Sequence, residues 1–219
     1  NRYMKWKTVN GDYESTLTAD YDTLFRGMFQ KKRLLDIIRN FICFDEDVDK
    51  TGKILTAYHQ YFAVNKAIER AMKAVDTDGH IGVFWHTQGS GKSLSMVFYA
   101  HQLIERFPRC TILVVTDRKD LDEQLYGQFA RCAGFLHQQP YKVEAKDDLK
   151  AVLKDREAGG IIFTTIQKFD NYDGALSQRR NIFVIADEAH RSQYGIFAEN
   201  MMKLLRIPMY IPVSLSMPQ

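Results

Sequence analysis

The stretch WHTQGSGKSLS, residues 85–95, decides how the rest of this sequence is interpreted. It continues the apolar run IGVFW at 81–85 and leads into SLSMVFYA, so that a strand, a loop and a helix are expected in succession. Gly89 and Gly91 allow the backbone to fold closely, and successive N–H groups then point inward beside the positive end of a helix. This arrangement predicts a loop that binds phosphate groups; the alternative is a glycine-rich turn with a solvated lysine.

His86 stands where the GxxxxGK[ST] phosphate-loop pattern begins with glycine. The difference changes the entry to the loop and leaves GKS at 91–93 intact. In such loops the lysine, here Lys92, reaches the β- and γ-phosphates of a nucleotide, and the hydroxyl of the next residue, here Ser93, ligates Mg²⁺. The residues expected to bind the nucleotide in this loop are Gln88, Gly89, Ser90, Gly91, Lys92 and Ser93.

Short apolar runs alternate with helical stretches after residue 80. Because the runs contain few polar residues, they indicate strands that are buried on both faces. Strands separated by helices are typical of right-handed βαβ units around a parallel sheet, so the sequence predicts an α/β fold. The expected strands are 81–85, 111–116, 160–165, 182–187 and 209–214, and the expected helices are 92–106, 119–131, 147–157 and 195–206.

The first fifty residues do not follow this pattern. Apolar residues at helical spacing predict one helix over 21–44, and a second amphipathic helix is expected over 58–75. The charged stretch DEDVDKTGK at 45–53 is the best candidate for a boundary. We therefore expect a helical linker at 1–50 and the main domain at 51–219.

The bulk composition excludes several classes of protein. With 45% hydrophobic and 26% charged residues among 219, the chain is ordinary for a globular protein, and its net charge of +3 permits nucleic acid binding without arguing for it. Cys43, Cys110 and Cys132 are widely spaced and form no CxxC pair, which argues against a zinc site or a disulfide framework. No apolar run approaches the roughly 20 residues of a membrane span, and the N-terminus lacks the core of a signal peptide. We expect a cytoplasmic protein with free thiols and, because the sequence begins without Met and ends abruptly, a fragment of a longer protein.

A second motif, FVIADEAHRS at 183–192, places Asp187 and Glu188 at the carboxyl end of an apolar strand. In an open parallel sheet, ligands bind at that edge. Asp187 can hold Mg²⁺ there through water, and Glu188 can orient or deprotonate the water that attacks a γ-phosphate. Alone, the segment is better interpreted as a helix N-cap with an acidic first turn, but the phosphate loop upstream reverses that preference. The sequence thus predicts Lys92, Asp187 and Glu188 as catalytic residues, and Ser93 and Asp187 as metal-binding residues.

The combination of GSGKS and DEAH resembles the first motor domain of superfamily 2 helicases and translocases. The closer likeness is to the restriction (R, or motor) subunit of type I restriction-modification enzymes, in which the first glycine of the loop is commonly absent. MKWKTVNG and FQKKRLLDIIRNFICF resemble the stretch that joins this family's nuclease domain to its motor, so the likeness covers nearly the whole chain. The segments that resemble the motor are YHQYFAVNKAIERA (58–71), GVFWHTQGSGKSLSMVFYA (82–100), LVVTDRKDLDEQL (113–125) and IADEAHRSQYG (185–195).

The resemblance implies a RecA-like parallel sheet flanked by helices, the fold of a P-loop NTPase, which binds ATP and Mg²⁺. It implies a motor that drives translocation of double-stranded DNA before cleavage, in a complex with methylation and specificity subunits. It further implies that Gln60 recognises adenine, since an amide can donate and accept together. Two segments after strands would contact the DNA backbone, which positions the DNA without reading its sequence; the alternative is a set of ordinary polar residues. Their residues are Thr116, Asp117 and Arg118 in the first segment, and Thr164, Thr165 and Gln167 in the second.

The chain also departs from that family. Residues 1–50 are too short for the family's nuclease core, and PVSLSMPQ at 212–219 only weakly matches the expected Thr-Gly-Thr-Pro segment. We find no second motor domain with its arginine finger, which contributes roughly 10³ to 10⁵ in rate in related systems, so we expect slow ATP hydrolysis by this chain alone. Two other functions stay open: a superfamily 2 DEAH-type RNA or DNA helicase domain, and a catalytically inactive nucleotide-binding scaffold.

Overall fold

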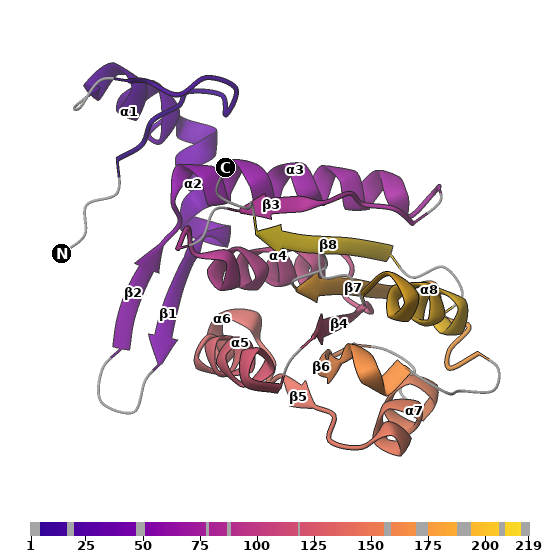
Figure 1. The fold of residues 1–219 in the computed structure, drawn as a ribbon. Coiled ribbons are helices and arrows are strands. Elements are labelled where there is room, and N and C mark those ends of the chain that lie inside the picture. Colours follow the sequence, from indigo (N-terminus) through magenta and orange to yellow (C-terminus); the bar gives the residue numbers. More distant parts are fainter. Residues whose placement is uncertain are drawn as a thin grey trace.

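The computed structural model of the chain describes residues 5–16, 20–46, 51–77, 79–86, 89–117, 119–155, 159–169, 175–187, 194–205 and 209–215. Within these residues the centre is a six-stranded parallel sheet with the strand order β3–β8–β7–β4–β6–β5 (Figure 1). Every neighbouring pair is parallel, which requires the crossover connections expected for βαβ units. The strands are β3 (Phe84–His86), β4 (Thr111–Thr116), β5 (Tyr141–Lys142), β6 (Ile161–Thr165), β7 (Ile182–Asp187) and β8 (Met209–Leu215).

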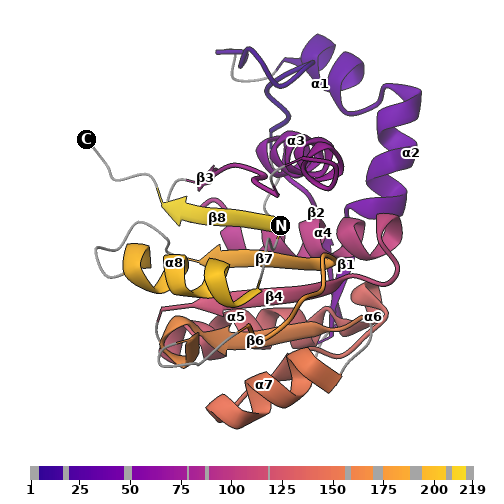
Figure 2. The ribbon, with the colours of Figure 1, turned by 90° about the vertical axis from the view of Figure 1, so that its right-hand side faces the viewer.

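Helices cover both faces of the sheet, and Figure 2 shows α4 and α8 on opposite sides. Side chains alternate along each strand, so that Ile112 and Val114 of β4 join one hydrophobic cluster and Leu113 and Val115 join the other. The first cluster contains residues of α3 (Tyr58–Ala74), α4 (Lys92–Arg106), α5 (Lys119–Arg131) and α6 (Ala133–Leu136). The second contains residues of α7 (Lys146–Asp155), the 3₁₀ helix η1 (Ile166–Phe169) and α8 (Tyr194–Leu205).

Most of the expected elements after residue 80 are confirmed. The helices predicted over 92–106 and 119–131 have those bounds, and the apolar runs at 111–116 and 182–187 are strands over their full length. β5 was not predicted, because a strand of two residues with an exposed tyrosine carries no periodic signal. In the part of the chain that the structure describes, no helix is long and apolar enough to span a membrane.

The single helix predicted over 21–44 is wrong. The chain forms α1 (Tyr21–Gly27), α2 (Lys31–Asn40) and then β1 (Ile42–Glu46). Each helix has its own side-chain cap: a carboxylate oxygen of Asp20 accepts from the Thr23 amide, and Gln30 Oε1 accepts from the Arg33 amide, both at 2.9 Å. A second cap inside a periodic stretch begins a new helix, and apolar spacing alone does not reveal it.

β1 pairs with β2 (Thr51–Leu55) in an antiparallel hairpin, with Ile42 opposite Leu55 and Glu46 opposite Thr51. The boundary drawn after residue 50 therefore falls between two strands that hydrogen-bond to each other. The residues before it also share the main core, since Trp6, Phe41 and Cys43 belong to the cluster that contains α3 and α4.

Candidate functional site

The loop predicted to bind phosphate lies between β3 and α4, at the carboxyl edge of the sheet. Gly89 and Gly91 both have positive φ angles, of 77° and 81°, and Gly91 is the N-cap of α4. Residues with a Cβ rarely adopt this left-handed conformation, so the turn depends on both glycines. The Gly91 carbonyl accepts from the Ser95 amide at 3.1 Å, which begins the helix. The N–H groups of the first turn, which no helix satisfies internally, therefore lie at the sheet edge.

Lys92, the first residue of α4, contacts Asp187, the last residue of β7. Lys92 Nζ lies 2.7 Å from Asp187 Oδ1, and the two side chains are only 16% and 8% exposed. β8 lies between β3 and β7, so the two charges come from elements that are not neighbours in the sheet. Charges that are this little exposed are tolerated when they are paired. The structure thus brings together the two groups that the sequence assigns to phosphate and to magnesium.

Three predicted site residues, Gln88, Arg118 and Glu188, lie outside the described residues, as does His190. Ser93 follows Lys92 in the first turn of α4 and is half-buried.

Gln60 lies against the loop. Its side chain is buried, and its Nε2 donates to the Gly91 carbonyl at 2.9 Å and to the Ser90 carbonyl at 3.4 Å. Its Oε1 accepts from the Ala57 amide at 2.8 Å, which caps α3. A Cβ added to Gly91 would lie 2.5 Å from Gln60 Nε2, so only glycine allows this approach. Recognition of adenine by Gln60 stays a prediction; what the geometry gives is a contact between α3 and the phosphate loop.

His59 is a site residue that sequence reasoning missed. Its Nε2 lies 2.9 Å from the Ser90 carbonyl, so a neutral ring with its proton on Nε2 donates to the loop. With Gln60 it forms two successive contacts from the start of α3 to the loop. The signal that could have revealed it is the pair of polar side chains at the first turn of a helix that the sequence already places beside the nucleotide.

The two segments predicted to contact DNA lie side by side at the same sheet edge. β4 and β6 are neighbours, with Thr116 opposite Thr165, and Gln167 Nε2 donates to the Asp117 carbonyl at 2.8 Å. Thr116, Thr164 and Thr165 are buried, so their hydroxyls are not available on the surface as they stand. Gln167 is the exposed side chain of the set. A contact with DNA stays a prediction, and it would involve Gln167 and the exposed backbone after the strands.

Asp122 fixes the first of these segments from behind. It is 2% exposed; Thr116 Oγ1 donates to its Oδ1 at 3.2 Å, and Lys142 Nζ lies 3.1 Å from its Oδ2. This buried carboxylate thereby joins the end of β4, the first turns of α5 and strand β5. No sequence pattern indicated this role, because its two partners lie on separate elements.

Comparison with known proteins agrees with this geometry. Residues 59–213 match the family model described as SWI2/SNF2 ATPase. The chain is 45% identical over 207 residues to the type I restriction enzyme HindI endonuclease subunit of Haemophilus influenzae, with 89% of this chain and 20% of that protein covered. It is 32% identical over 211 residues to a protein of Mycoplasma pneumoniae, the C-terminal part of the putative type I restriction enzyme MpnIIP endonuclease subunit, with 88% of this chain and 95% of that protein covered.

A solved structure supports the fold. The crystal structure of T4 UvsW matches with a TM-score of 0.60 at 16% identity, covering 85% of this chain and 34% of that one. At that identity the likeness concerns the fold alone, and it confirms the predicted RecA-like parallel sheet with flanking helices. Against the Haemophilus protein, the chain spans about a fifth of its relative's length.

Proposed function

Because the chain belongs to the SWI2/SNF2 ATPase family and to the endonuclease subunits of type I restriction enzymes, we propose that it is the ATP-binding motor domain of such a subunit. The observation that supports this most directly is the 2.7 Å contact of Lys92 with Asp187 beside a loop held by two left-handed glycines. Neither a solvated lysine nor a simple acidic helix cap would place these two charges together in a partly buried site.

The residues present suit a magnesium nucleotide. The backbone N–H groups of the loop and the Lys92 ammonium would hold the phosphates, while the Ser93 hydroxyl and the Asp187 carboxylate offer the oxygen ligands that Mg²⁺ prefers. A bound Mg²⁺ neutralises charge on the phosphate oxygens. Glu188, the next residue in the chain, would orient or deprotonate the attacking water.

Gln60 can serve adenine without leaving the loop. Its NH₂ group has two hydrogens, of which one makes the 2.9 Å bond to Gly91 and the other makes only a 3.4 Å contact with Ser90. A bond of 3.4 Å is weak, so the second hydrogen is the one that we propose for the base. Nucleotide occupancy would then be sensed directly by the residue that touches the loop.

We further propose that the sheet edge formed by β4 and β6 positions double-stranded DNA. The bond between Gln167 and Asp117 holds the ends of these strands together, so a contact at either would be transmitted to the other. Asp117 itself is acidic and does not attract phosphate, which leaves the backbone N–H groups and Gln167 as the proposed contacts.

The activities of the longer subunit are proposals on the same ground. They are ATP-dependent translocation of double-stranded DNA, cleavage of that DNA, and assembly with methylation and specificity subunits. Such an enzyme would act in the cytoplasm, where it meets both DNA and ATP.

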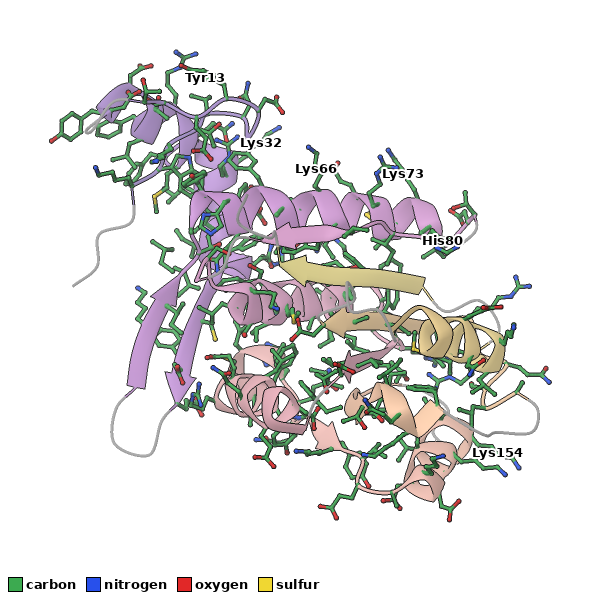
Figure 3. All side chains as sticks on the ribbon, in the orientation of Figure 1. Tyr13, Lys32, Lys66, Lys73, His80 and Lys154 are labelled. Atoms are coloured by element: carbon green, nitrogen blue, oxygen red, sulfur yellow. The ribbon has the colours of Figure 1, made fainter. Side chains whose placement is uncertain are left out.

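Titration with a fluorescent ATP analogue and Mg²⁺ tests the proposal. We expect Lys92→Ala to weaken binding by about 10- to 150-fold, since a charge-assisted hydrogen bond contributes about 1.5–3 kcal/mol. Lys66→Ala is the matched control, because Lys66 is exposed on the outer side of α3, away from the loop (Figure 3). Equal affinity of the two folded variants would contradict the assignment of the loop, and no binding by the unsubstituted chain would favour the inactive scaffold.

A further inference from the structure

Two of the three cysteines, which the sequence places far apart, meet in the structure. Cys43 lies in the middle of β1, and Cys132 is the N-cap of α6, directly after α5. Both are fully buried, and their thiols share a hydrogen bond. The spacing of the cysteines in the sequence excluded CxxC pairs but could not show that a hairpin strand and a helix end bring two of them together.

The surrounding contacts hold β1 against the end of α5. Arg131 Nε donates to Asp45 Oδ1 at 2.9 Å, two residues from Cys43 and one from Cys132. Gln128 Nε2 donates to Cys132 Sγ at 3.5 Å, and its Oε1 accepts from Arg131 at 3.0 Å. Contacts on both sides of the pair therefore fix the two sulfur atoms relative to each other.

These contacts also make the two thiols chemically different. The hydrogen bond from Cys43, with the Gln128 amide and the Arg131 charge, lowers the pKa of Cys132. The same hydrogen bond, together with burial, raises the pKa of Cys43. Cys132 is thus the sulfur that carries thiolate character, and Cys43 is the proton donor beside it. The thiolate is the nucleophilic form of cysteine, so attack on an oxidant would begin at Cys132.

We propose that Cys43 and Cys132 are an oxidisable thiol pair, which hydrogen peroxide converts to a disulfide that joins the β1–β2 hairpin to the end of α5. In the first step the Cys132 thiolate attacks one oxygen of peroxide, the O–O bond breaks, and sulfenic acid and hydroxide form. In the second, Cys43 sulfur attacks the Cys132 sulfenic sulfur, the S–S bond forms, and hydroxide leaves. The Cys43 proton and one solvent proton complete the two waters, and the two sulfurs supply the two electrons.

The hairpin gives the oxidant a route to the pair. β1 and β2 form a sheet of two strands, and such a pair is marginally stable by itself. Its outer side is exposed at Phe44 (50%) and Leu55 (40%), so little holds it closed on that side. Local opening of the hairpin exposes Cys43 and Cys132 without unfolding the central sheet.

Cys110 provides an internal comparison. It is buried at 4% exposure, and desolvation raises its pKa to about 12, so it remains a thiol at neutral pH. Its sulfur lies near the Leu103 carbonyl. An oxidant that simply reacted with accessible or denatured cysteines would not distinguish Cys110 from the pair.

The test is oxidation of the 219-residue chain with hydrogen peroxide, blocking of the remaining thiols with iodoacetamide, and mass spectrometry of the digested protein. We expect a peptide that links Cys43 to Cys132, lighter by two hydrogens than its separate parts and released by dithiothreitol. Cys110→Ser should give the same linked peptide, whereas Cys43→Ser and Cys132→Ser should give none. The unsubstituted chain alone decides the matter if a serine variant does not fold, because the link is read directly from its peptides.

Two other results would overturn the proposal. One is a link that involves Cys110 or a second molecule; the other is irreversible oxidation of Cys132 with Cys43 still open to iodoacetamide. The melting temperature of the oxidised chain should also rise by at least about 4 °C, since a disulfide across a long segment restricts the unfolded chain. A linked chain with an unchanged melting temperature would show that the bond does not hold the hairpin to α5.

Discussion

Replacing Gly91 by alanine tests the contact between the phosphate loop and α3. The change introduces two separate costs that the structure distinguishes. Gly91 has a φ of 81°, where a residue with a Cβ is strained, and the new Cβ would lie 2.5 Å from Gln60 Nε2. Gly89 is the matched control: its φ is 77°, but a Cβ added there meets nothing within 4 Å. Gly89→Ala therefore measures the strain alone.

The expected magnitudes follow from these contacts. Left-handed backbone costs an alanine about 1–2 kcal/mol, so this is the expected loss of unfolding free energy for Gly89→Ala. In Gly91→Ala the flexible Gln60 side chain must also move, which breaks its bonds to the carbonyls of Ser90 and Gly91. Each such bond contributes about 0.5–1.5 kcal/mol, so the total expected for Gly91→Ala is about 2–5 kcal/mol.

Urea unfolding followed by circular dichroism gives both free energies, and a double variant isolates the clash. When Gln60 is already alanine, Gly91→Ala should cost no more than Gly89→Ala does, because the group that it displaces is gone. The reasoning is refuted if Gly91→Ala and Gly89→Ala destabilise equally, or if removing Gln60 leaves the difference between them unchanged.

Two further predictions concern carboxylates away from the loop. Asp122→Asn should lower the unfolding free energy by about 1–3 kcal/mol in urea titrations, because Lys142 loses a partner that is 2% exposed; Glu123→Gln, at 75% exposure and 3.9 Å from the same amine, should change it by less than about 0.5 kcal/mol. The hydroxyl of Ser15 leads the contacts that lower the pKa of Asp20 from 3.8 to about 2, so its stabilising charge is complete above pH 4 and is lost as the pH falls towards 2. The urea midpoints of Asp20→Asn and the unsubstituted chain should therefore converge over that range, and a constant gap would contradict the assignment.

The central sheet was predictable because its physics is local. Runs such as TILVVT and IFVIAD are buried on both faces, so every residue is apolar or nearly so, and the strand extends as far as the run. The helices between them carry their own periodicity. β3 is the exception: the apolar run at 81–85 predicted a strand there, but the strand is Phe84–His86, since Gly82 has a φ of 119° and interrupts the extended backbone.

The candidate site was predictable only as a set of separate motifs. Sequence patterns placed Lys92 on a loop and Asp187 on a strand end, and the rule that ligands bind at the carboxyl edge of a parallel sheet placed both on one side. No pattern showed that they touch. The contacts of His59 with the loop, and of Lys142 with Asp122, join elements that are distant in the chain, and such pairs have no signature in a single sequence.

The division of the chain at residue 50 shows why a charged stretch is a poor guide to domain boundaries. Trp6 packs against Tyr58, Tyr61 and Phe62, the aromatic residues around the start of α3. The same turn of α3 carries Gln60, which contacts the phosphate loop. The N-terminal segment thus supports the helix that supports the loop, and it belongs to the same packed unit. Charged residues mark exposure to water, and hairpin turns inside a domain are as exposed as linkers between domains.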